Sequence, residues 1–323
     1  MIHAAIVGLG RWGRGFCESV QGKSARLRFV HAADSAPEAA RELAAKHGFR
    51  LSADFSEALA DPEVQALVLA TPHSLHRDQV LACARAGKHV FCEKPLALKR
   101  ADAERMIEAC AKAGVVLGVG HNRRFWPSMQ ALKRAVESGE LGQILHLEGH
   151  FSNEHSNNVK GGWRLLPEES PGAGMTGAGL HVLDAFIDLA GPVRRVRAQI
   201  VSQKPAPAPL DTLSALYEFA NGTSGMLATI RATPQYWRVH VFGAKASAEA
   251  LGEKELLLHR SGVAPQRHSF EAVDSQRAEL EAFADAIDKR AAFHIPAAQM
   301  LATVAAFEAT VQAAESGRTV DLG

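Results

Sequence analysis

Residues 2–13 read IHAAIVGLGRWG, a short apolar run followed at once by three glycines in the pattern GxGxxG. These glycines are Gly8, Gly10 and Gly13. The apolar run predicts a buried strand over Ile2–Val7, and the pattern behind it predicts a helix over Trp12–Val20. In such a turn the first glycine permits the tight bend, the second lets a diphosphate approach the backbone, and the third lets the helix pack on the strand. The amides at the helix N-terminus can bind that diphosphate.

An acidic residue, Asp34, ends the next predicted strand, Leu27–Ala33. It follows Gly13 by about 20 residues, the spacing expected of the acid that binds the ribose hydroxyls of a dinucleotide. The glycine pattern alone is weak evidence, but the two features together predict dinucleotide binding. The carboxylate would repel a 2′-phosphate, and no basic residue follows before Arg41, so NAD is favoured over NADP. The alternative is that Asp34 only caps the following helix.

The chain as a whole has the composition of an ordinary globular protein. Its 323 residues, 47% hydrophobic and 22% charged, predict about two domains. The formal net charge of +1 would not gather nucleic acid or an anionic membrane surface, so neither is expected as a partner. We see no leader pattern and no apolar run of ~18 residues, and expect a cytoplasmic protein. Four cysteines without a CxxC pair are expected to be reduced and buried: Cys17, Cys83, Cys92 and Cys110.

Short apolar runs alternate with helical stretches up to about residue 120. The runs expected as strands are Ile2–Val7, Leu27–Ala33, Ala66–Ala70, His89–Cys92 and Val115–Val119. The expected helices are Trp12–Val20, Pro37–His47, His76–Ala86 and Ala101–Ala113. This alternation predicts an α/β domain over residues 1–121, with a doubly wound parallel sheet between two layers of helices. Ser35 and Glu38 have the spacing of a capping box, which supports the second helix.

The pattern changes after a helix expected over Pro127–Ser138. Longer alternating runs predict strands at Ile144–Ser152, Val193–Ser202, Leu213–Phe219, Thr223–Ile230 and Val239–Gly243. Asn221-Gly222 predicts a tight hairpin turn, and the proline-rich Lys204–Pro209 a loop. The closing helices are expected over Leu280–Lys289 and Ala297–Ser316. We therefore expect a C-terminal α+β domain over residues 122–323, built on an open, mostly antiparallel sheet.

Two polar clusters follow strands of the expected parallel sheet, at the edge where such sheets bind ligands. The residues concerned are Thr71, Pro72, His73 and His76 after the third strand, and Glu93, Lys94 and Pro95 after the fourth. Lys94 is thus expected where a nicotinamide ring and its substrate would meet. Burial and a nearby positive charge lower the pKa of a lysine, which favours proton transfer. The alternative is a solvated lysine paired with Glu93. Arg11 and Trp12, in the glycine turn, complete the expected cofactor-binding residues.

Four segments in this order resemble the glucose-fructose oxidoreductase, inositol dehydrogenase and MocA (Gfo/Idh/MocA) family: GLGRWG (8–13), TPHSLH (71–76), AGKHVFCEKP (86–95) and HNRRF (121–125). The resemblance extends to residues 139–142, 163–164, 179–184 and 316–320. It implies an N-terminal Rossmann domain that binds NAD(P), and a substrate domain whose open sheet forms homodimers or homotetramers. It also implies that the lysine of the EKP motif, Lys94, contacts substrate or relays a proton.

The same resemblance implies an acid/base histidine in the second domain, which His181 matches. The family commonly has an aspartate four residues earlier, where this chain has Gly177, a departure from the inositol-type pattern. We expect His181 and Lys94 to share the proton transfer, with Asp184 orienting the histidine or the substrate. The alternative is a purely structural role for His181 and Asp184. The candidate substrate contacts are Arg123, Trp163 and Arg164, with structural salt bridging as the alternative for the first.

The chain is therefore expected to be an NAD(P)-dependent oxidoreductase that moves a hydride between nicotinamide and a hydroxyl or carbonyl group of a sugar, polyol or related small alcohol. Two alternatives stay open: an NAD-dependent glycoside hydrolase of similar fold, and a non-catalytic protein that senses NAD or a metabolite. No metal is expected. His146, Glu148 and His150 alternate on one strand as zinc ligands could, but a polar sheet face explains them equally well.

Overall fold

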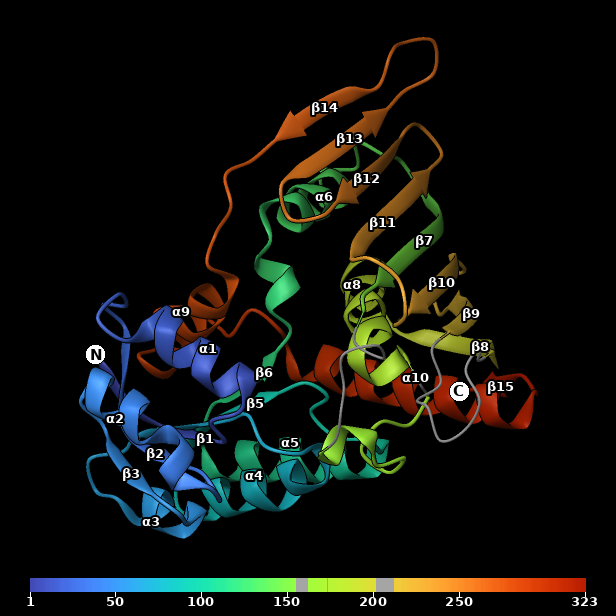
Figure 1. Cartoon of the computed structure of the whole chain (residues 1–323). Coiled ribbons are helices and arrows are strands. Elements are labelled where there is room, and N and C mark those ends of the chain that lie inside the picture. Colours follow the sequence, from blue (N-terminus) through green and yellow to red (C-terminus); the bar gives the residue numbers. More distant parts are fainter. Residues whose placement is uncertain (155–161, 173, 202–211) are drawn as a thin grey trace. The chain divides into compact units, whose positions relative to one another are not determined.

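The computed structural model describes residues 1–154, 162–172, 174–201 and 212–323 (Figure 1). The expected loop Lys204–Pro209 lies outside these residues, as does the expected end of a strand at Ser202. Contacts between Cα atoms divide the chain into two compact units. The first comprises Met1–Asn122 and Asp274–Met300, and the second comprises Arg123–Val273 and Leu301–Gly323.

The first unit is built on a six-stranded parallel sheet in the order β3-β2-β1-β4-β5-β6. Its strands are β1 (Ile2–Val7), β2 (Leu27–Ala33), β3 (Arg50–Ser52), β4 (Ala66–Leu69), β5 (His89–Glu93) and β6 (Leu117–Gly120). Its helices are α1 (Arg11–Val20), α2 (Arg41–His47), α3 (Phe55–Ala60), α4 (His76–Arg85), α5 (Arg100–Ala113) and α9 (Ser275–Ile287). Helices α1 and α9 pack together on one face, and α4 and α5 on the other (Figure 1). The predicted doubly wound α/β fold is confirmed.

Helix α9 completes the core of this unit, although the sequence pattern places residues 274–300 in the second domain. Its Leu280 and Phe283 are fully buried and belong to the same apolar cluster as Phe16 and Phe29. The ring of Phe283 lies 5.6 Å from that of Phe91, centroid to centroid. An amphipathic pattern shows that a helix covers a sheet, but it does not show which sheet.

The helix expected over Pro37–His47 is wrong in its first turn. Residues Pro37–Ala40 form a 3-10 turn, and α2 begins only at Arg41. The predicted capping box is absent, because no side chain caps this turn. Instead, Asp34 Oδ1 accepts a hydrogen bond from the Ala36 amide at 2.8 Å and starts the turn one residue earlier. The sequence pattern also missed β3 and α3, which are too short to display a period.

The second unit is built on a nine-stranded sheet in the order β14-β13-β12-β11-β7-β10-β9-β8-β15. Its strands are β7 (Ile144–Ser152), β8 (Val193–Val201), β9 (Thr212–Phe219), β10 (Ser224–Ile230), β11 (Tyr236–Gly243), β12 (Ser247–Leu251), β13 (Glu255–His259), β14 (Gln266–Ser269) and β15 (Val320–Asp321). Its helices are α6 (Pro127–Glu137), α8 (Leu180–Ala190) and all but the first turn of α10 (Ala297–Ser316). The mostly antiparallel sheet is confirmed, with one exception: β7 and β10, which are not consecutive in the chain, pair in parallel.

The predicted hairpin at Asn221-Gly222 joins β9 to β10. Gly222 has a φ of +86°, and its amide donates to the Phe219 carbonyl at 3.0 Å. Asn221 does not share the positive φ; its side-chain oxygen accepts from the Thr223 amide at 3.0 Å. Glycine therefore supplies the left-handed residue, and asparagine supplies a local hydrogen bond.

One face of the nine-stranded sheet exposes apolar side chains. Leu216 and Met226 are directly paired across β9 and β10, and Tyr236 on β11 is also exposed. The homodimer or homotetramer expected from the sequence stays a prediction. Among the residues that the structure describes, no helix combines the length and the apolar character of a membrane span.

The turn after β1 is formed by backbone groups in very close contact. Gly8 has a φ of +88°, and a Cβ atom there would lie 2.6 Å from the Ala70 carbonyl oxygen. A Cβ atom on Gly13 would lie 1.9 Å from the Gly8 carbonyl oxygen, so only glycine lets α1 start this close to β1. At Gly10 a Cβ atom would meet nothing within 4 Å. The three glycines thus have the three different environments that the sequence predicts.

The contrast between Gly13 and Gly10 gives a test of the fold. We expect Gly13→Ala to lower the free energy of unfolding by about 1–3 kcal/mol or more, because the backbone of the turn must move. Gly10→Ala is the matched control and should change it by less than about 0.5 kcal/mol. Chemical denaturation followed by circular dichroism measures both. Equal destabilisation by the two variants would contradict this assignment of the turn.

Candidate functional site

The carboxyl ends of four neighbouring strands form one edge of the six-stranded sheet. Val7 of β1 is in register with Ala33 of β2 and Leu69 of β4, and Leu69 is in register with Cys92 of β5. Residues that follow these strands therefore lie along one edge, about 4.8 Å apart from strand to strand. This carboxyl edge carries Asp34, the glycine turn 8–13, Thr71 and Lys94 in that spatial order. The strand order reverses between β1 and β4, where open α/β sheets bind their ligands.

The glycine turn leaves room for a ligand at the start of α1. Gly10 is the N-cap of α1 and provides no side-chain cap, and no acidic residue occupies the first turn. The open space at Gly10 is therefore next to the backbone amides at the start of α1, and these amides could donate hydrogen bonds to a diphosphate. Arg11 is exposed beside it, while Trp12 stacks on Phe16 with centroids 6.4 Å apart. The residues of this turn fit a dinucleotide.

Arg14, in the first turn of α1 after Arg11, binds two backbone carbonyl groups. Its Nε donates to the Leu9 carbonyl at 3.0 Å, and its Nη2 donates to the Ala39 carbonyl at 2.5 Å. The side chain therefore ties the glycine turn to the turn that follows β2. Of the two arginines, Arg11 is the one left exposed at the helix N-terminus.

Asp34 lies next to the glycine turn and is only half-buried. Its Oδ2 accepts from the Leu9 amide at 2.5 Å, and its Oδ1 accepts from the Ala36 amide at 2.8 Å. A carboxylate oxygen has two acceptor positions, so each oxygen can also accept from a ribose hydroxyl. Asp34 thus binds the backbone ahead of the following turn without capping a helix, and it stands at the position expected for ribose binding.

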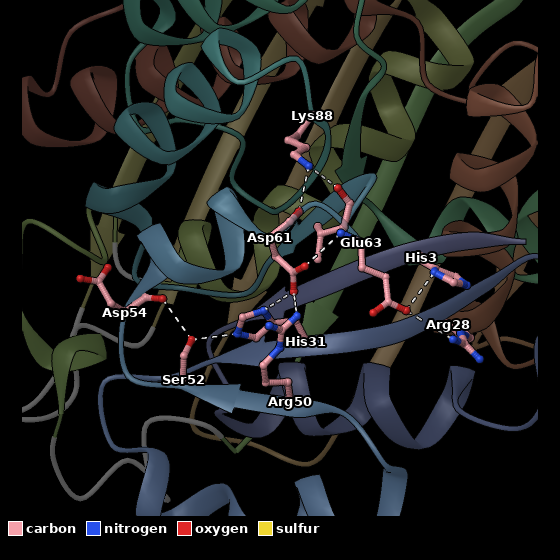
Figure 2. Close-up of polar contacts among 10 residues, drawn as sticks. His3, Arg28, His31, Arg50, Ser52, Asp54, Asp61, Glu63 and Lys88 are labelled. Atoms are coloured by element: carbon pink, nitrogen blue, oxygen red, sulfur yellow. Dashed lines mark hydrogen bonds and ion pairs between the residues drawn. The ribbon is translucent and has the colours of Figure 1, made fainter.

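A polar network that includes the buried side chains of His31, Ser52 and Asp61 lies next to the backbone of Asp34; Figure 2 shows the network. The Asp34 amide donates to the Ser52 carbonyl at 3.1 Å, and the Ser52 hydroxyl lies 3.1 Å from His31 Nε2. His31 Nδ1 lies 2.8 Å from Asp61 Oδ2, which also accepts from Arg50. Burial raises the pKa of Asp61, but the Glu63 amide, His31 and Arg50 outweigh it, so the pKa is lowered and the carboxylate stays charged. No local pattern in the sequence indicates this network, because its members are up to 30 residues apart.

The residues after β4 and β5 are tied together by His76. Its Nδ1 lies 2.8 Å from the Pro95 carbonyl oxygen, and its Nε2 lies 3.2 Å from that of Thr71. The Thr71 hydroxyl donates to Gln79 Oε1 at 2.6 Å, and the His73 ring packs on that of His76 at 5.8 Å. Pro72 precedes the 3-10 turn His73–Leu75. His76 therefore fixes the relative positions of two strand ends at the carboxyl edge.

Lys94 is buried where β5 ends, and its peptide bond to Pro95 is cis. Lys94 is 8% exposed and Glu93 is 5% exposed, which is not the environment of a solvated surface lysine. The Glu93 carboxylate accepts from the Lys94 amide at 3.1 Å. It lies against Gly120 on β6, where a Cβ atom would come within 2.7 Å of it. The lysine and the acid are thus both held inside the carboxyl edge.

The four cysteines are buried, as predicted, and offer no nucleophile. Burial raises the pKa of the Cys17 and Cys83 thiols to about 12 and that of Cys110 to about 11. For Cys92, next to Glu93, burial likewise raises the pKa of the thiol well above its usual value. Neutral thiols are poor nucleophiles.

In the second unit, His181 stands at the start of α8. A π-helical turn, Met175–Gly179, leads directly into this helix. Gly149 on β7 lets α8 approach the sheet, since a Cβ atom there would lie 2.2 Å from Val182 Cγ1. The His181 ring is buried and packs on the edge of Phe151, with centroids 6.1 Å apart. π-Helical turns are frequent at functional sites.

Asp184 is paired with an arginine rather than with His181 in the contacts described. Arg124 donates to both carboxylate oxygens, from Nε at 2.8 Å and from Nη2 at 2.6 Å, and a further nitrogen reaches Asp188 at 3.0 Å. Burial lowers the pKa of Arg124, but the charges of Asp184 and Asp188 outweigh it and raise the pKa. This geometry supports the structural alternative for Asp184. Its expected role in orienting His181 stays a prediction.

The candidate substrate contacts are held by aromatic rings. The Arg123 guanidinium lies 4.3 Å from the Phe151 centroid and 5.0 Å from that of Trp126. Arg164 lies over the ring of its neighbour Trp163 at 4.2 Å. Stacking on aromatic faces orients a guanidinium without using its hydrogen-bond donors.

The zinc alternative has no support in the second unit. His146 contacts the Ser224 hydroxyl at 2.7 Å, Glu148 pairs with Arg238 at 3.2 Å, and the His150 ring packs on Tyr236. No group of three or more possible metal ligands occurs among the described residues.

Comparison with known proteins agrees with this geometry. Residues 2–121 match the family described as "Oxidoreductase family, NAD-binding Rossmann fold", and residues 129–249 match the "GFO/IDH/MocA C-terminal domain". A 4-carboxy-2-hydroxymuconate-6-semialdehyde dehydrogenase of Sphingobium is 34% identical over 61% of this chain and 62% of its own. A myo-inositol 2-dehydrogenase of Thermotoga maritima is 40% identical over 44% of this chain and 42% of its own. The chain thus spans less than two thirds of the length of these two relatives.

Solved structures extend the likeness to the whole chain. A putative NADPH-dependent oxidoreductase from Desulfitobacterium hafniense is 26% identical, with a TM-score of 0.91 over 99% of this chain and 97% of its own. A levoglucosan dehydrogenase in complex with NADH and L-sorbose, 22% identical, has the same fold, with a TM-score of 0.89 over 100% of this chain and 99% of its own. With both domain models matched on the same chain, the protein belongs to the Gfo/Idh/MocA family of NAD(P)-binding oxidoreductases.

Proposed function

We propose that this protein is an NAD-dependent dehydrogenase that transfers a hydride between nicotinamide and a hydroxyl or carbonyl carbon of a small polar molecule. The observation that carries the proposal is the burial of Lys94 at the carboxyl edge, two strands along the sheet from the glycine turn. The names of the relatives, which include an inositol dehydrogenase and a levoglucosan dehydrogenase, support a sugar, polyol or related alcohol as the substrate.

The chain's own residues handle orientation and protons. The dinucleotide, when bound, accepts or supplies the hydride. The glycine turn and the amides of α1 would hold its diphosphate, and Asp34 would hold its ribose. As a carbinol carbon gives up hydride, the oxygen must lose its proton, and we assign that proton to Lys94 Nζ or to a ring nitrogen of His181. Each role is proposed on the geometry of the residue's own unit.

The role of Lys94 is tested by Lys94→Ala. We expect kcat to fall about 10²- to 10⁴-fold, because proton transfer is lost, while the Kd for NAD changes little. The exposed Lys99→Ala is the matched control and should leave both values unchanged. The assay follows NADH fluorescence over a panel of sugars, polyols, inositols and hydroxy acids, and NAD binding is measured by calorimetry.

Three outcomes of this assay argue against the proposal. A parallel loss of turnover and NAD binding in Lys94→Ala would contradict the role of the lysine. Release of sugar from a glycoside without net NADH would favour the hydrolase alternative. NAD binding without turnover of any compound in the panel would favour a sensor.

The preference for NAD is tested at Asp34. We expect the wild-type protein to bind NAD more tightly than NADP, because a 2′-phosphate would meet the Asp34 carboxylate. Asp34→Ser should shift the ratio of the two Kd values towards NADP by about tenfold or more, a change of about 1.4 kcal/mol. Glu38→Gln, which removes an exposed carboxylate four residues away, is the control. An unchanged ratio in Asp34→Ser would show that this carboxylate does not select the cofactor.

A further inference from the structure

The strand β3 has few backbone contacts with the rest of the six-stranded sheet. It comprises only Arg50–Ser52 and stands at the end of the strand order, so that β2 is its one neighbour among the described strands. Its last residue, Ser52, is in register with Ala33 at the end of β2. The Asp34 amide extends this pairing by one residue, since it donates to the Ser52 carbonyl at 3.1 Å. The position of Ser52 therefore bears directly on the backbone of Asp34.

A side-chain contact between His31 and Ser52 adds a second connection between β2 and β3. The Ser52 hydroxyl lies 3.1 Å from His31 Nε2 and donates to the Asp54 carbonyl at 3.2 Å, as Figure 2 shows. His31 and Ser52 are both buried. A buried polar group that loses its partner costs free energy, because water does not replace the lost contact. The hydroxyl of Ser52 thus helps to keep the end of β3 next to β2.

The orientation of the His31 ring is fixed by Asp61, in the loop between α3 and β4. His31 Nδ1 lies 2.8 Å from Asp61 Oδ2, and Asp61 Oδ1 accepts from the Glu63 amide at 3.0 Å. The Asp61 carbonyl also accepts from Lys88 Nζ at 3.1 Å. A charged carboxylate can only accept hydrogen bonds, so the hydrogen of the contact with His31 is on Nδ1. Asp61 therefore selects the ring orientation in which Nε2 faces Ser52.

Asp34 is held at three points, and one of them depends on β3. The Leu9 and Ala36 amides donate to the two carboxylate oxygens of Asp34, at 2.5 Å and 2.8 Å. The contact with the Ser52 carbonyl holds its backbone instead. Buried polar networks whose members are satisfied keep a segment in a single arrangement. A loosened β3 would shift the backbone of Asp34 without releasing its carboxylate.

We infer that the network of His31, Ser52 and Asp61 determines how strictly this protein selects NAD over NADP. Through the Ser52 carbonyl, the network holds Asp34 where its carboxylate meets the ribose of NAD and repels the 2′-phosphate of NADP. The three residues are positioning residues, because they act through Asp34. This inference rests on the role proposed above for Asp34, and it names the residues on which that role depends.

The inference is tested first by Ser52→Ala. We measure the Kd values for NAD and NADP by calorimetry and take their ratio as the preference for NAD. Ser52→Ala should lower this preference about three- to fivefold, the effect of losing about one hydrogen bond. The effect should be smaller than that of Asp34→Ser, because two amides still hold the carboxylate. Asp61→Asn disturbs the same network from its other end and should change the ratio in the same direction.

The matched control is Ser24→Ala. The Ser24 hydroxyl also binds the backbone of the first unit, since it accepts from the Arg26 and Leu27 amides at 3.1 Å and 3.3 Å. It does so before the amino end of β2, whereas Asp34 follows the carboxyl end. We therefore expect Ser24→Ala to lower the free energy of unfolding, measured by chemical denaturation, without changing the ratio of the Kd values. An equal change of the ratio in Ser24→Ala and Ser52→Ala would overturn the inference.

A double-mutant cycle shows whether the network acts through Asp34. In the background of Asp34→Ser, adding Ser52→Ala should change the ratio by less than about twofold, because the carboxylate that the network positions is already absent. Independent effects that multiply in the double variant would overturn the inference. A Ser52→Ala variant that is less stable but keeps the wild-type ratio would also overturn it, because the network would then only stabilise the fold.

The same binding measurements separate this inference from the proposed function. A changed ratio in Asp34→Ser, with no change in Ser52→Ala or Asp61→Asn, would overturn the inference and leave the proposed function standing. An unchanged ratio in Asp34→Ser would overturn the proposed cofactor selection and the inference with it. Selective binding of NAD that depends on Ser52, without turnover of any compound in the panel, would uphold the inference and overturn the proposed dehydrogenase activity.

Discussion

The contact between Gly13 and the Gly8 carbonyl is the constraint from which the rest of the first unit follows. There is no room for a Cβ atom at Gly13, so α1 begins directly above the end of β1 and directs its free amides into the space next to Gly10. The same turn is fixed from the other side by Asp34, which accepts the Leu9 amide. An anion site at a helix N-terminus and an acid beside it are therefore produced by one turn. The other residues of the carboxyl edge, Thr71 and Lys94, lie near this turn because they follow the neighbouring strands β4 and β5.

Local patterns in the sequence predicted the elements that this edge needs. The strands β1, β2, β4 and β5 each show a buried apolar run, and Gly8, Asp34 and Lys94 follow such runs at fixed offsets. What the pattern missed was either too short or not local. β3 has three residues, and α9 joins the first unit because Phe283 packs on Phe91, a contact across nearly two hundred residues of chain. The parallel pairing of β7 with β10 likewise joins strands that are far apart in the chain, which a local pattern does not reveal.

Some residues of the candidate site can likewise be predicted from local sequence patterns, and others cannot. The glycine turn and the EKP lysine are visible in the sequence because the chemistry requires them within a few residues of a strand end. The network of His31, Ser52 and Asp61 is invisible there, because each residue alone reads as an ordinary strand or loop position (Figure 2). Asp184 shows a different limit: its spacing from His181 predicts that it orients the histidine or the substrate, which stays a prediction, whereas its contacts with Arg124 were not visible in the sequence. Spacing on a helix fixes which residues share a face, but it does not fix which partner reaches them from another element.

The acidic side chains of α8 are paired with basic residues of the second unit. Asp184 and Asp188 are both bound by Arg124, and Lys133 also pairs with Asp188 at 3.2 Å, so the negative charges of this helix are balanced within the second unit.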